Sequence, residues 1–287
     1  GNNNSAYGAY ALQANTTGTK NTAVGMQSLD ANTTGVDNTA IGYNALTSNT
    51  TAGYNTAVGK DSMLTNSTGA NNTALGYQSL FSNSTANNNT AVGYTAMYAN
   101  STGHSNVGVG YQSLYNNTTG TSNVAVGWNA ADANTTGGAI TAIGEHALGG
   151  NTTGSDNTAC GREALKNNTT GGRLVAVGAY ALKDYNVTDT GNNYNVAVGY
   201  ECSKALTTGT LNTAVGGQSM LVATTPDTTT AIGYRAAYSL TTANNNTFIG
   251  AYAGYACTTG AGNVTIGKDS GSQSAMLNIT TESNRLV

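Results

Sequence analysis

Few residues of this chain combine the type and the spacing that catalysis requires. Glu145 and Glu163 lie on neighbouring repeats and could approach the roughly 5–9.5 Å carboxylate separation that glycoside hydrolysis uses, but no cleft-forming insertion lies beside them. His104 and His146 have no recurrent aspartate partner and no nucleophile motif nearby. We read both histidines as solvated outer residues and expect a protein that is not an enzyme.

The three cysteines do not indicate a metal or redox site. Cys160, Cys202 and Cys257 lack the CxxC spacing of zinc ligands, so we expect no metal and no other cofactor. They lie several repeats apart, which argues against an intrachain disulfide. Cys160 stands where other repeats carry Val or Ile, so we expect it to be a small buried apolar residue.

The composition excludes two classes of partner. Charged residues make up 8% of the chain, the net charge is −3, and there is no basic run, so we expect no nucleic acid and no anionic membrane as a partner. No apolar stretch approaches the roughly 18 residues of a membrane-spanning helix, so we expect no membrane insertion. The chain begins at Gly1 without a signal peptide, which indicates a fragment or a processed product.

One glycine recurs along the whole chain. It follows an aliphatic residue and falls at Gly8, Gly25, Gly42, Gly59, Gly76, Gly93, Gly110, Gly127, Gly144, Gly161, Gly178, Gly199, Gly216, Gly233, Gly250 and Gly267. Every interval is seventeen residues except the one from Gly178 to Gly199, which is twenty-one. We number the unit from the Asn at position 1 through this Gly at position 5 to position 17. Such a period is typical of stacked repeats that bury their apolar faces against one another.

The sequence therefore predicts an all-β fold, a parallel β-solenoid or β-roll of sixteen 17-residue coils, assembled as an elongated homotrimer. The solenoid is expected over residues 1–271, with a four-residue insertion within 183–194. After Gly267 the pattern fails, and we interpret residues 272–287 as a neck or cap leading to a region absent here.

Positions 1–5 read Asn-(Thr/Val)-Ala-(Val/Ile)-Gly, the alternation of a short strand with two faces. We expect position 4 to point into the solenoid. Position 3 accepts almost nothing larger than Ala, which suggests another backbone close to the opposite face and hence a second chain. The expected repeat core is represented by Ala23, Val24, Gly25, Leu29, Ala57, Val58, Gly59, Ala125, Val126 and Gly127.

The rest of the unit is less defined. Positions 6–9 form a second inward segment, either a strand or one helical turn. Positions 12–15 are Asn-Thr-Thr-Gly, a turn that also creates Asn-x-Thr/Ser glycosylation sequons such as Asn32 and Asn66. The asparagines at positions 1 and 12 are expected to stack as amide ladders. The 23 charged residues avoid positions 1–5, 8, 9 and 12–15, so we expect these positions to form packed surfaces.

Position 6 carries a column of aromatic residues. If the column faces solvent, its rings could form a platform for sugar rings; the alternative is a ladder that only shields the coil edge. The insertion adds two tyrosines on a loop, a place where binding residues are common. The residues expected to face a ligand are Tyr77, Tyr94, Tyr111, Trp128, Tyr185 and Tyr194.

Two resemblances follow from the repeat. The phrase Asn-Thr-Ala-Val-Gly at 21–25, 55–59 and 212–216 resembles the head repeat of YadA-like trimeric autotransporter adhesins, although the unit is longer here. That resemblance implies the inner strand of a left-handed parallel β-roll in a homotrimer. The longer phrase at 72–85 is similar to repeats of bacteriophage tail fibres, and Asn284-Arg285-Leu286-Val287 resembles the approach to their endosialidase-type intramolecular chaperone.

The resemblances imply a non-enzymatic fibre shaft or receptor-binding region of a phage tail fibre that mediates host attachment. Its partners would be copies of itself and a host surface glycan or protein receptor, on a virion or in an extracellular setting. A bacterial cell-surface adhesin or filament of the same architecture is the alternative. An ice-binding protein is a weaker alternative, because adjacent threonines such as Thr33 and Thr34 would point to opposite sides of the chain. A polysaccharide-degrading tailspike is also weaker, because no cleft-forming insertion lies beside Glu145 and Glu163.

Overall fold

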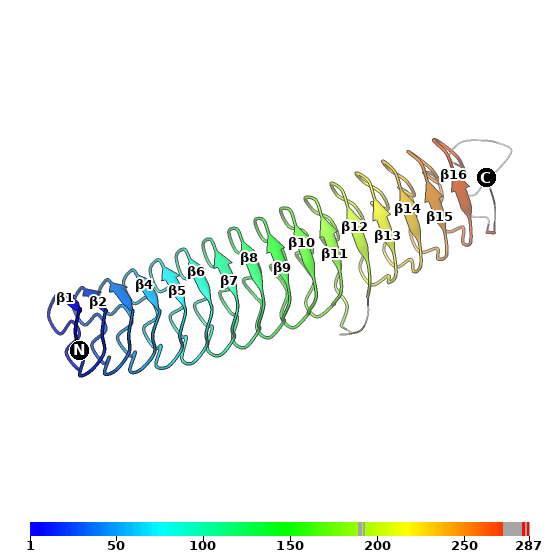
Figure 1. Cartoon of the computed structure of the whole chain (residues 1–287). Coiled ribbons are helices and arrows are strands. Elements are labelled where there is room, and N and C mark those ends of the chain that lie inside the picture. Colours follow the sequence, from blue (N-terminus) through cyan, green and yellow to red (C-terminus); the bar gives the residue numbers. More distant parts are fainter. Residues whose placement is uncertain (189–190, 192, 272–282, 285, 287) are drawn as a thin grey trace. The chain divides into compact units, whose positions relative to one another are not determined.

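The computed structural model describes residues 1–188, 191, 193–271, 283, 284 and 286 (Figure 1). The described residues contain three-residue parallel strands and no helix, so the predicted all-β solenoid of about seventeen residues per coil is confirmed. The strands are β1 Ser5–Tyr7, β2 Thr22–Val24, β3 Thr39–Ile41, β4 Thr56–Val58, β5 Thr73–Leu75, β6 Thr90–Val92, β7 Val107–Val109, β8 Val124–Val126, β9 Thr141–Ile143, β10 Thr158–Cys160, β11 Val175–Val177, β12 Val196–Val198, β13 Thr213–Val215, β14 Thr230–Ile232, β15 Thr247–Ile249 and β16 Val264–Ile266.

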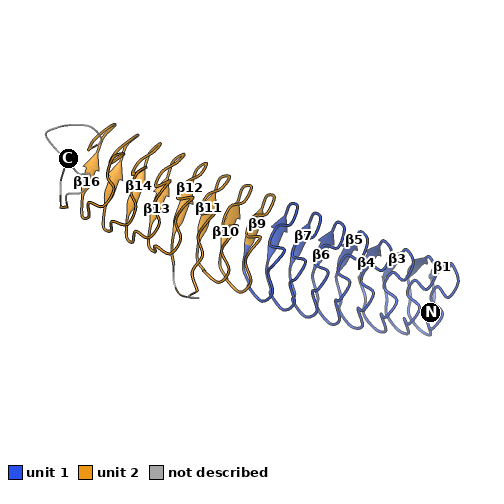
Figure 2. Cartoon of the chain, turned by 180° about the vertical axis from the view of Figure 1, so that it is seen from behind, with its two compact units in different colours: residues 1–140 blue, residues 141–287 orange. Residues whose placement is uncertain are grey.

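The chain divides into two compact units, Gly1–Ile140 and Thr141–Val287 (Figure 2). Strands β1 to β8 belong to the first unit and β9 to β16 to the second, and in each unit the strands are paired in sequence order. Every residue pairs with the same position of the next coil, as Thr22 does with Thr39 and Ala23 with Ala40. The seventeen-residue period of the sequence is thus the register of the sheet.

The two faces of each strand are the reverse of what the sequence suggested. Ala23, Ala57 and Ala125 at position 3 are fully buried, whereas Val24 and Val126 at position 4 are 37% exposed. The prediction that position 4 points into the solenoid is wrong, as is the assignment of Val24, Val58 and Val126 to the core, since Val58 is also partly exposed. The residue at position 3 is limited to alanine by side chains of the same chain, so its small size gives no evidence of a second chain.

The side chains that fill the coil explain this small alanine. A Cβ added to Gly108, at position 3, would lie 2.8 Å from Met97 Cγ at position 9 of the preceding coil and 3.1 Å from Ser113 Oγ at position 8. Leu29, Leu80 and Met97 at position 9 are fully buried. The large residue of each coil therefore comes from position 9 and leaves room for a methyl group at position 3.

One coil inverts this arrangement. Phe248 stands at position 3 of its coil and is fully buried, and position 9 of the same coil is Gly254. A Cβ added to Gly254 would lie 2.4 Å from Phe248 Cδ1. The ring of Phe248 thus fills the volume that a position-9 side chain fills elsewhere.

Positions 6–11 form neither a strand nor a helical turn. The backbone is left-handed at positions 7 and 9 in nearly every coil, as at Gln78 and Leu80, and again at position 17, as at Lys20. Position 5 requires glycine for two reasons. Gly76 has a φ of 138°, and a Cβ there would lie 2.3 Å from the carbonyl oxygen of Gly93 in the next coil.

The expected amide ladders are present and fully buried. At position 1, Asn21 Oδ1 accepts the backbone N–H of Asn38 at 3.0 Å, and Asn21 Nδ2 donates to the carbonyl of Gly35 at 2.8 Å. At position 12, Asn49 Nδ2 donates to Asn32 Oδ1 at 2.8 Å and to its own turn. Each buried amide is therefore hydrogen-bonded to the neighbouring coil and to its own.

The second unit replaces one of these ladders with apolar residues. From the eleventh coil onward, position 12 is Tyr185, Leu206, Ala223, Leu240 and Cys257, all fully buried. The twenty-one-residue coil begins at the same point, yet β11 and β12 keep their register, with Val175 opposite Val196. The positions on either side place the four extra residues between Thr188 and Asn193, so the expected insertion does not disturb the sheet. The expected neck or cap at 272–287 lies almost entirely outside the described residues.

Candidate interaction surface

The outward face of the sheet carries an apolar band, defined here as positions 2, 4 and 6. Position 4 exposes Ile41 by 41%, Leu75 by 46% and Ile232 by 39%. No charged residue occurs at position 2 or 4 in any coil. The expectation that uncharged positions are packed within the chain is therefore wrong for positions 2 and 4. A contiguous exposed apolar band of this kind is typical of an interaction surface.

The predicted aromatic column at position 6 exists in the first unit. Tyr77 and Tyr94 stack with centroids 5.2 Å apart, Tyr94 and Tyr111 at 5.4 Å, and Tyr111 and Trp128 at 6.3 Å. Tyr94 is 49% exposed and Trp128 48%. Because interplanar angles between the tyrosines are 18° or less, neighbouring ring faces cover each other, and the column presents ring edges to solvent. This geometry favours the shielding ladder over a platform for sugar rings.

A second aromatic column at position 10 was missed by the sequence reading. Phe81 and Tyr98 stack at 5.0 Å, and Tyr98 and Tyr115 at 5.2 Å, with interplanar angles near 10°. Its signal was present in the repeat as three successive aromatic residues seventeen apart. Both columns add stacking between coils of the first unit.

The two tyrosines of the long coil have different environments. Tyr185 is fully buried at position 12, so the prediction that it faces a ligand is wrong. Tyr194 is 46% exposed at position 17, and the guanidinium carbon of Arg173 lies 5.9 Å from its ring centroid. Only Tyr194 of this pair is available to a ligand.

The Asn-Thr-Thr turn presents one exposed hydroxyl column. At position 13 the hydroxyl of Thr33 donates to the carbonyl of Thr50 in the next coil at 3.0 Å, and the same bond recurs along the chain. At position 14 the threonines, such as Thr34 and Thr51, are exposed. The sequon asparagines Asn32 and Asn66 are fully buried in the ladder, so they are inaccessible to glycosylation in the folded protein.

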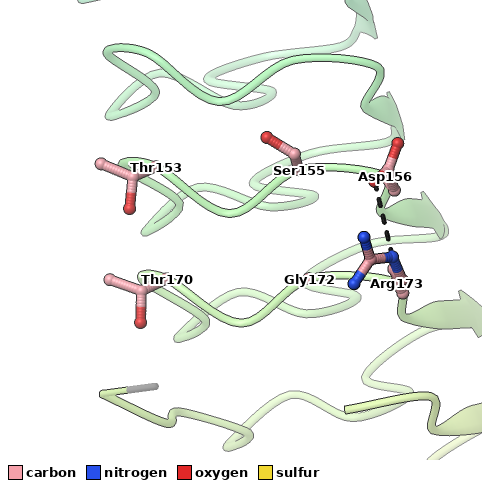
Figure 3. A pocket seen from close by; sticks show the side chains of 6 residues that line it. All are labelled: Thr153, Ser155, Asp156, Thr170, Gly172 and Arg173. Carbon is pink, nitrogen blue, oxygen red and sulfur yellow. Dashed lines mark ion pairs between the residues drawn. The ribbon is translucent and has the colours of Figure 1, made fainter. Parts of the chain in front are cut away.

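A small hollow lies beside this turn in the second unit (Figure 3). It has a volume of about 130 Å³ and is lined by Thr153, Ser155, Asp156, Thr170, Gly172 and Arg173. Arg173 Nε lies 3.8 Å from Asp156 Oδ2, and both side chains are about half exposed. An exposed pair of this kind contributes little to stability or to specific recognition.

The carboxylate of Glu163 is bound by two lysines. Its oxygens lie 2.7 Å from Lys183 Nζ and 3.2 Å from Lys166 Nζ, and the hydrogen bond from Lys183 is the main reason that the pKa of Glu163 is lowered. A general acid in glycoside hydrolysis needs the opposite shift. Arg162, next to Glu163 in the chain, donates from Nη2 to the hydroxyl of Tyr180.

A second ionic group lies on the following coils. Lys204 Nζ and Gln218 Nε2 each donate to Glu201 at 2.9 Å, and Arg235 Nε donates to Gln218 Oε1 at 2.7 Å. The hydrogen bond from Gln218, followed by that from Lys204, lowers the pKa of Glu201. Side chains of three successive coils are thereby linked at positions 7 and 10.

The three cysteines and His104 lie in different coils. Cys202 and Cys257 are buried free thiols, and burial raises their pKa to about 12 and about 11. Cys160 is partly exposed because position 4 faces outward, so its predicted burial is wrong. His104 is exposed, with Nδ1 3.3 Å from the hydroxyl of Ser105.

The part of the chain that the structure describes offers neither a metal site nor a membrane-spanning helix. No group of three or more His, Cys, Asp or Glu side chains there could hold a metal ion. No helix among these residues has the length and apolarity needed to cross a membrane. Comparison of the sequence with protein-family models and with curated proteins finds no match.

Proposed function

We propose that this chain is a non-enzymatic structural region of a phage tail fibre, self-associating as a homotrimer and contributing to host attachment. The observation that carries the proposal is the exposed band at positions 2, 4 and 6 of the outward face, which carries no charged residue at positions 2 and 4. A flat band of β-branched residues is typical of a packed surface. Because this band is exposed, it favours packing against the same repeat in another copy of the chain. The resemblance to trimeric adhesin and tail-fibre repeats supports the same assembly.

The size of the band is consistent with a stable interface. Positions 2 to 6 span roughly 13 Å along the strand direction, and eight coils at about 4.8 Å span about 38 Å, so the band of each unit covers on the order of 500 Å². A standard interface needs about 800 Å² per partner. The band of either unit by itself supplies more than half of that area.

The experiment is light scattering on the purified chain, whose mass is 28.9 kDa. We expect a particle of three times that mass. The double variant Ile41→Lys/Ile232→Lys places one charge on the band of each unit at residues that are 41% and 39% exposed, so it should fold and yet be monomeric. The matched control, Thr51→Lys/Thr242→Lys, places the same charges on the exposed hydroxyl column and should remain trimeric. A monomeric unmodified chain would contradict the proposal.

Attachment is tested separately with bacterial cells. If the chain mediates attachment, the purified trimer should bind the host cells and compete with the intact phage for adsorption. A bacterial adhesin or filament of the same architecture is the second candidate, since the same band would serve it equally. The flanking coding sequence distinguishes the two: a downstream intramolecular chaperone favours the phage fibre, and a membrane-anchor barrel favours the adhesin.

A further inference from the structure

The aromatic residue Tyr200 differs from those of the stacked columns. It stands at position 6 of its coil, and the residues at position 6 on either side are Ala179 and Gly217. Its side chain is 54% exposed, and its described ring contact is an edge contact with Tyr180, at a centroid distance of 6.1 Å and an interplanar angle of 79°. No column neighbour covers its ring as Tyr77 and Tyr111 cover Tyr94.

Cationic groups gather around the ring of Tyr180, the ring that Tyr200 contacts edge to face. The guanidinium carbon of Arg162 lies 4.7 Å from the ring centroid of Tyr180, and Lys183 Nζ and Lys204 Nζ each lie 5.4 Å from it. These cations come from three successive coils, at positions 6 and 10. A cluster of this kind is unusual in a chain whose net charge is −3.

The acidic partners of these lysines lie deeper than the lysines do. The side chains of Lys183 and Lys204 are 27% and 35% exposed, against 18% for Glu163 and 15% for Glu201. The lysine side chains are therefore more exposed than the glutamate side chains with which they pair. A dissolved anion would meet the positive charges first, and the ion pairs hold the lysines in place before it binds.

The backbone at this place is already paired. Glu201 N–H donates to the carbonyl of Ala179 at 2.9 Å, and Gln218 N–H donates to that of Tyr200 at 2.8 Å. A peptide could not add as a strand here, because the groups that would bind it are used between coils. Recognition must therefore use the side chains: an uncovered aromatic ring, cations, and the oxygen acceptors of Glu201.

We propose that Tyr200, with Arg162, Lys183 and Lys204, forms a binding site for an acidic polysaccharide that carries carboxylate groups. The C–H face of a sugar ring would pack on the ring of Tyr200, and the sugar carboxylate would pair with the lysines and Arg162. Glu201 would accept a hydrogen bond from a sugar hydroxyl. This site would supply the ligand class of the proposed attachment function. Its role on a host surface rests on that proposed function.

The test is calorimetric titration of the full chain with an oligogalacturonate, a neutral maltooligosaccharide of the same length, and inorganic phosphate. We expect binding of the oligogalacturonate only, weakening as salt is raised. Tyr200→Ala should weaken it roughly three- to tenfold, the effect of losing one aromatic packing partner. Lys183→Gln/Lys204→Gln should weaken it and flatten its salt dependence.

The controls separate this site from the rest of the chain. Tyr94→Ala removes a tyrosine of similar exposure whose faces are already stacked, and Lys268→Gln removes an exposed lysine elsewhere; both should bind as the unmodified chain does. Equal binding of the neutral sugar, full competition by phosphate at equal affinity, an unchanged Tyr200→Ala variant, or no binding at all would each overturn the proposal. A monomeric chain that binds the oligogalacturonate would support this site and contradict the homotrimer. A trimeric chain that does not bind it would contradict this site and support the homotrimer.

Discussion

Asn72 Oδ1 accepts the backbone N–H of Asn89, one coil further along, at a distance of 2.9 Å, although both side chains are fully buried. The Nδ2 of the same Asn72 donates to the carbonyl of Ala86 at 2.8 Å. One side chain thus satisfies a buried donor and a buried acceptor that no water can reach. The ladder built from this relationship holds successive coils together where the apolar core is thin.

Removing one such amide should be costly. Asn72→Ala leaves the N–H of Asn89 and the carbonyl of Ala86 without this side chain as a partner. At about 1–3 kcal/mol for each group, we expect a loss of roughly 2–6 kcal/mol in the free energy of unfolding. Urea denaturation followed by circular dichroism measures the loss. Thr68→Ala, at an exposed position of the preceding turn, is the matched control and should change stability by less than about 0.5 kcal/mol. Equal stability of the two variants would show that the ladder contributes nothing.

The two recurrent glycines should respond differently to alanine. Gly76→Ala, at position 5, forces a side chain into a left-handed conformation against the next backbone, and we expect a loss of about 2 kcal/mol or more. A Cβ on Gly69, at position 15, would also lie close to the next coil, 2.3 Å from the carbonyl oxygen of Ala86. Gly69→Ala should nevertheless cost less than Gly76→Ala, about 1 kcal/mol, because φ there is not left-handed and Ala52 and Ala86 occupy the same position in other coils. Thermal melts of the two variants rank them, and the reverse order would contradict the assignment.

Phe248 and Gly254 should be energetically coupled. Gly254→Leu restores the usual residue at position 9 but collides with the ring of Phe248, so the single variant should lose roughly 1–3 kcal/mol or more from overpacking. The double variant Phe248→Ala/Gly254→Leu recreates the pair found in most coils and should recover most of the loss. A double-mutant cycle in urea gives the coupling free energy. Additive effects would mean that the two residues do not share one volume.

The three cysteine thiols should differ in their reactivity because they differ in solvent exposure. Cys202 and Cys257 are buried with pKa values of about 12 and about 11, so few thiolates form at pH 8, whereas Cys160 is partly exposed on the apolar band. We expect an aromatic disulfide reagent to modify Cys160 before the two buried thiols in the native protein, and all three thiols in denaturant. In the band-disrupting variant Ile41→Lys/Ile232→Lys, Cys160 should react faster than in the trimer. Rapid modification of all three native thiols would contradict the described burial.

Acid should weaken the two ionic groups of the second unit. The folded-state pKa of Glu163 is lowered by Lys183 and that of Glu201 by Gln218, so their stabilisation is present above the unfolded-state pKa of about 4.3 and is lost as the pH falls through the folded value. Glu163→Gln/Glu201→Gln should be less stable than the unmodified chain at pH 7, by under about 1 kcal/mol for each partly buried carboxylate. The difference should shrink as the pH falls below about 4.3. A gap that persists in acid would assign the effect to packing instead of charge.

The sequence by itself determined the period, the position of each strand, the buried amide ladders and the long coil between Gly178 and Gly199. These features depend on one residue type in one local role, such as Gly76 in a conformation that other residues avoid or Asn72 between two coils. Because the spacing is seventeen residues in nearly every coil, the same residue type has the same structural role in each copy. Parallel register then follows, because identical positions stack.

The tertiary structure alone decided which face of the strand is inside. A strand of two β-branched residues around one alanine has two apolar faces, and neither alternation nor charge ranks them. The choice is made by Leu80 and its equivalents at position 9, whose left-handed backbone turns them into the coil and fills it so fully that only alanine fits opposite. The same volume limit pushes Val24 and Ile41 outward and creates the apolar band, a consequence of packing that no local pattern contains.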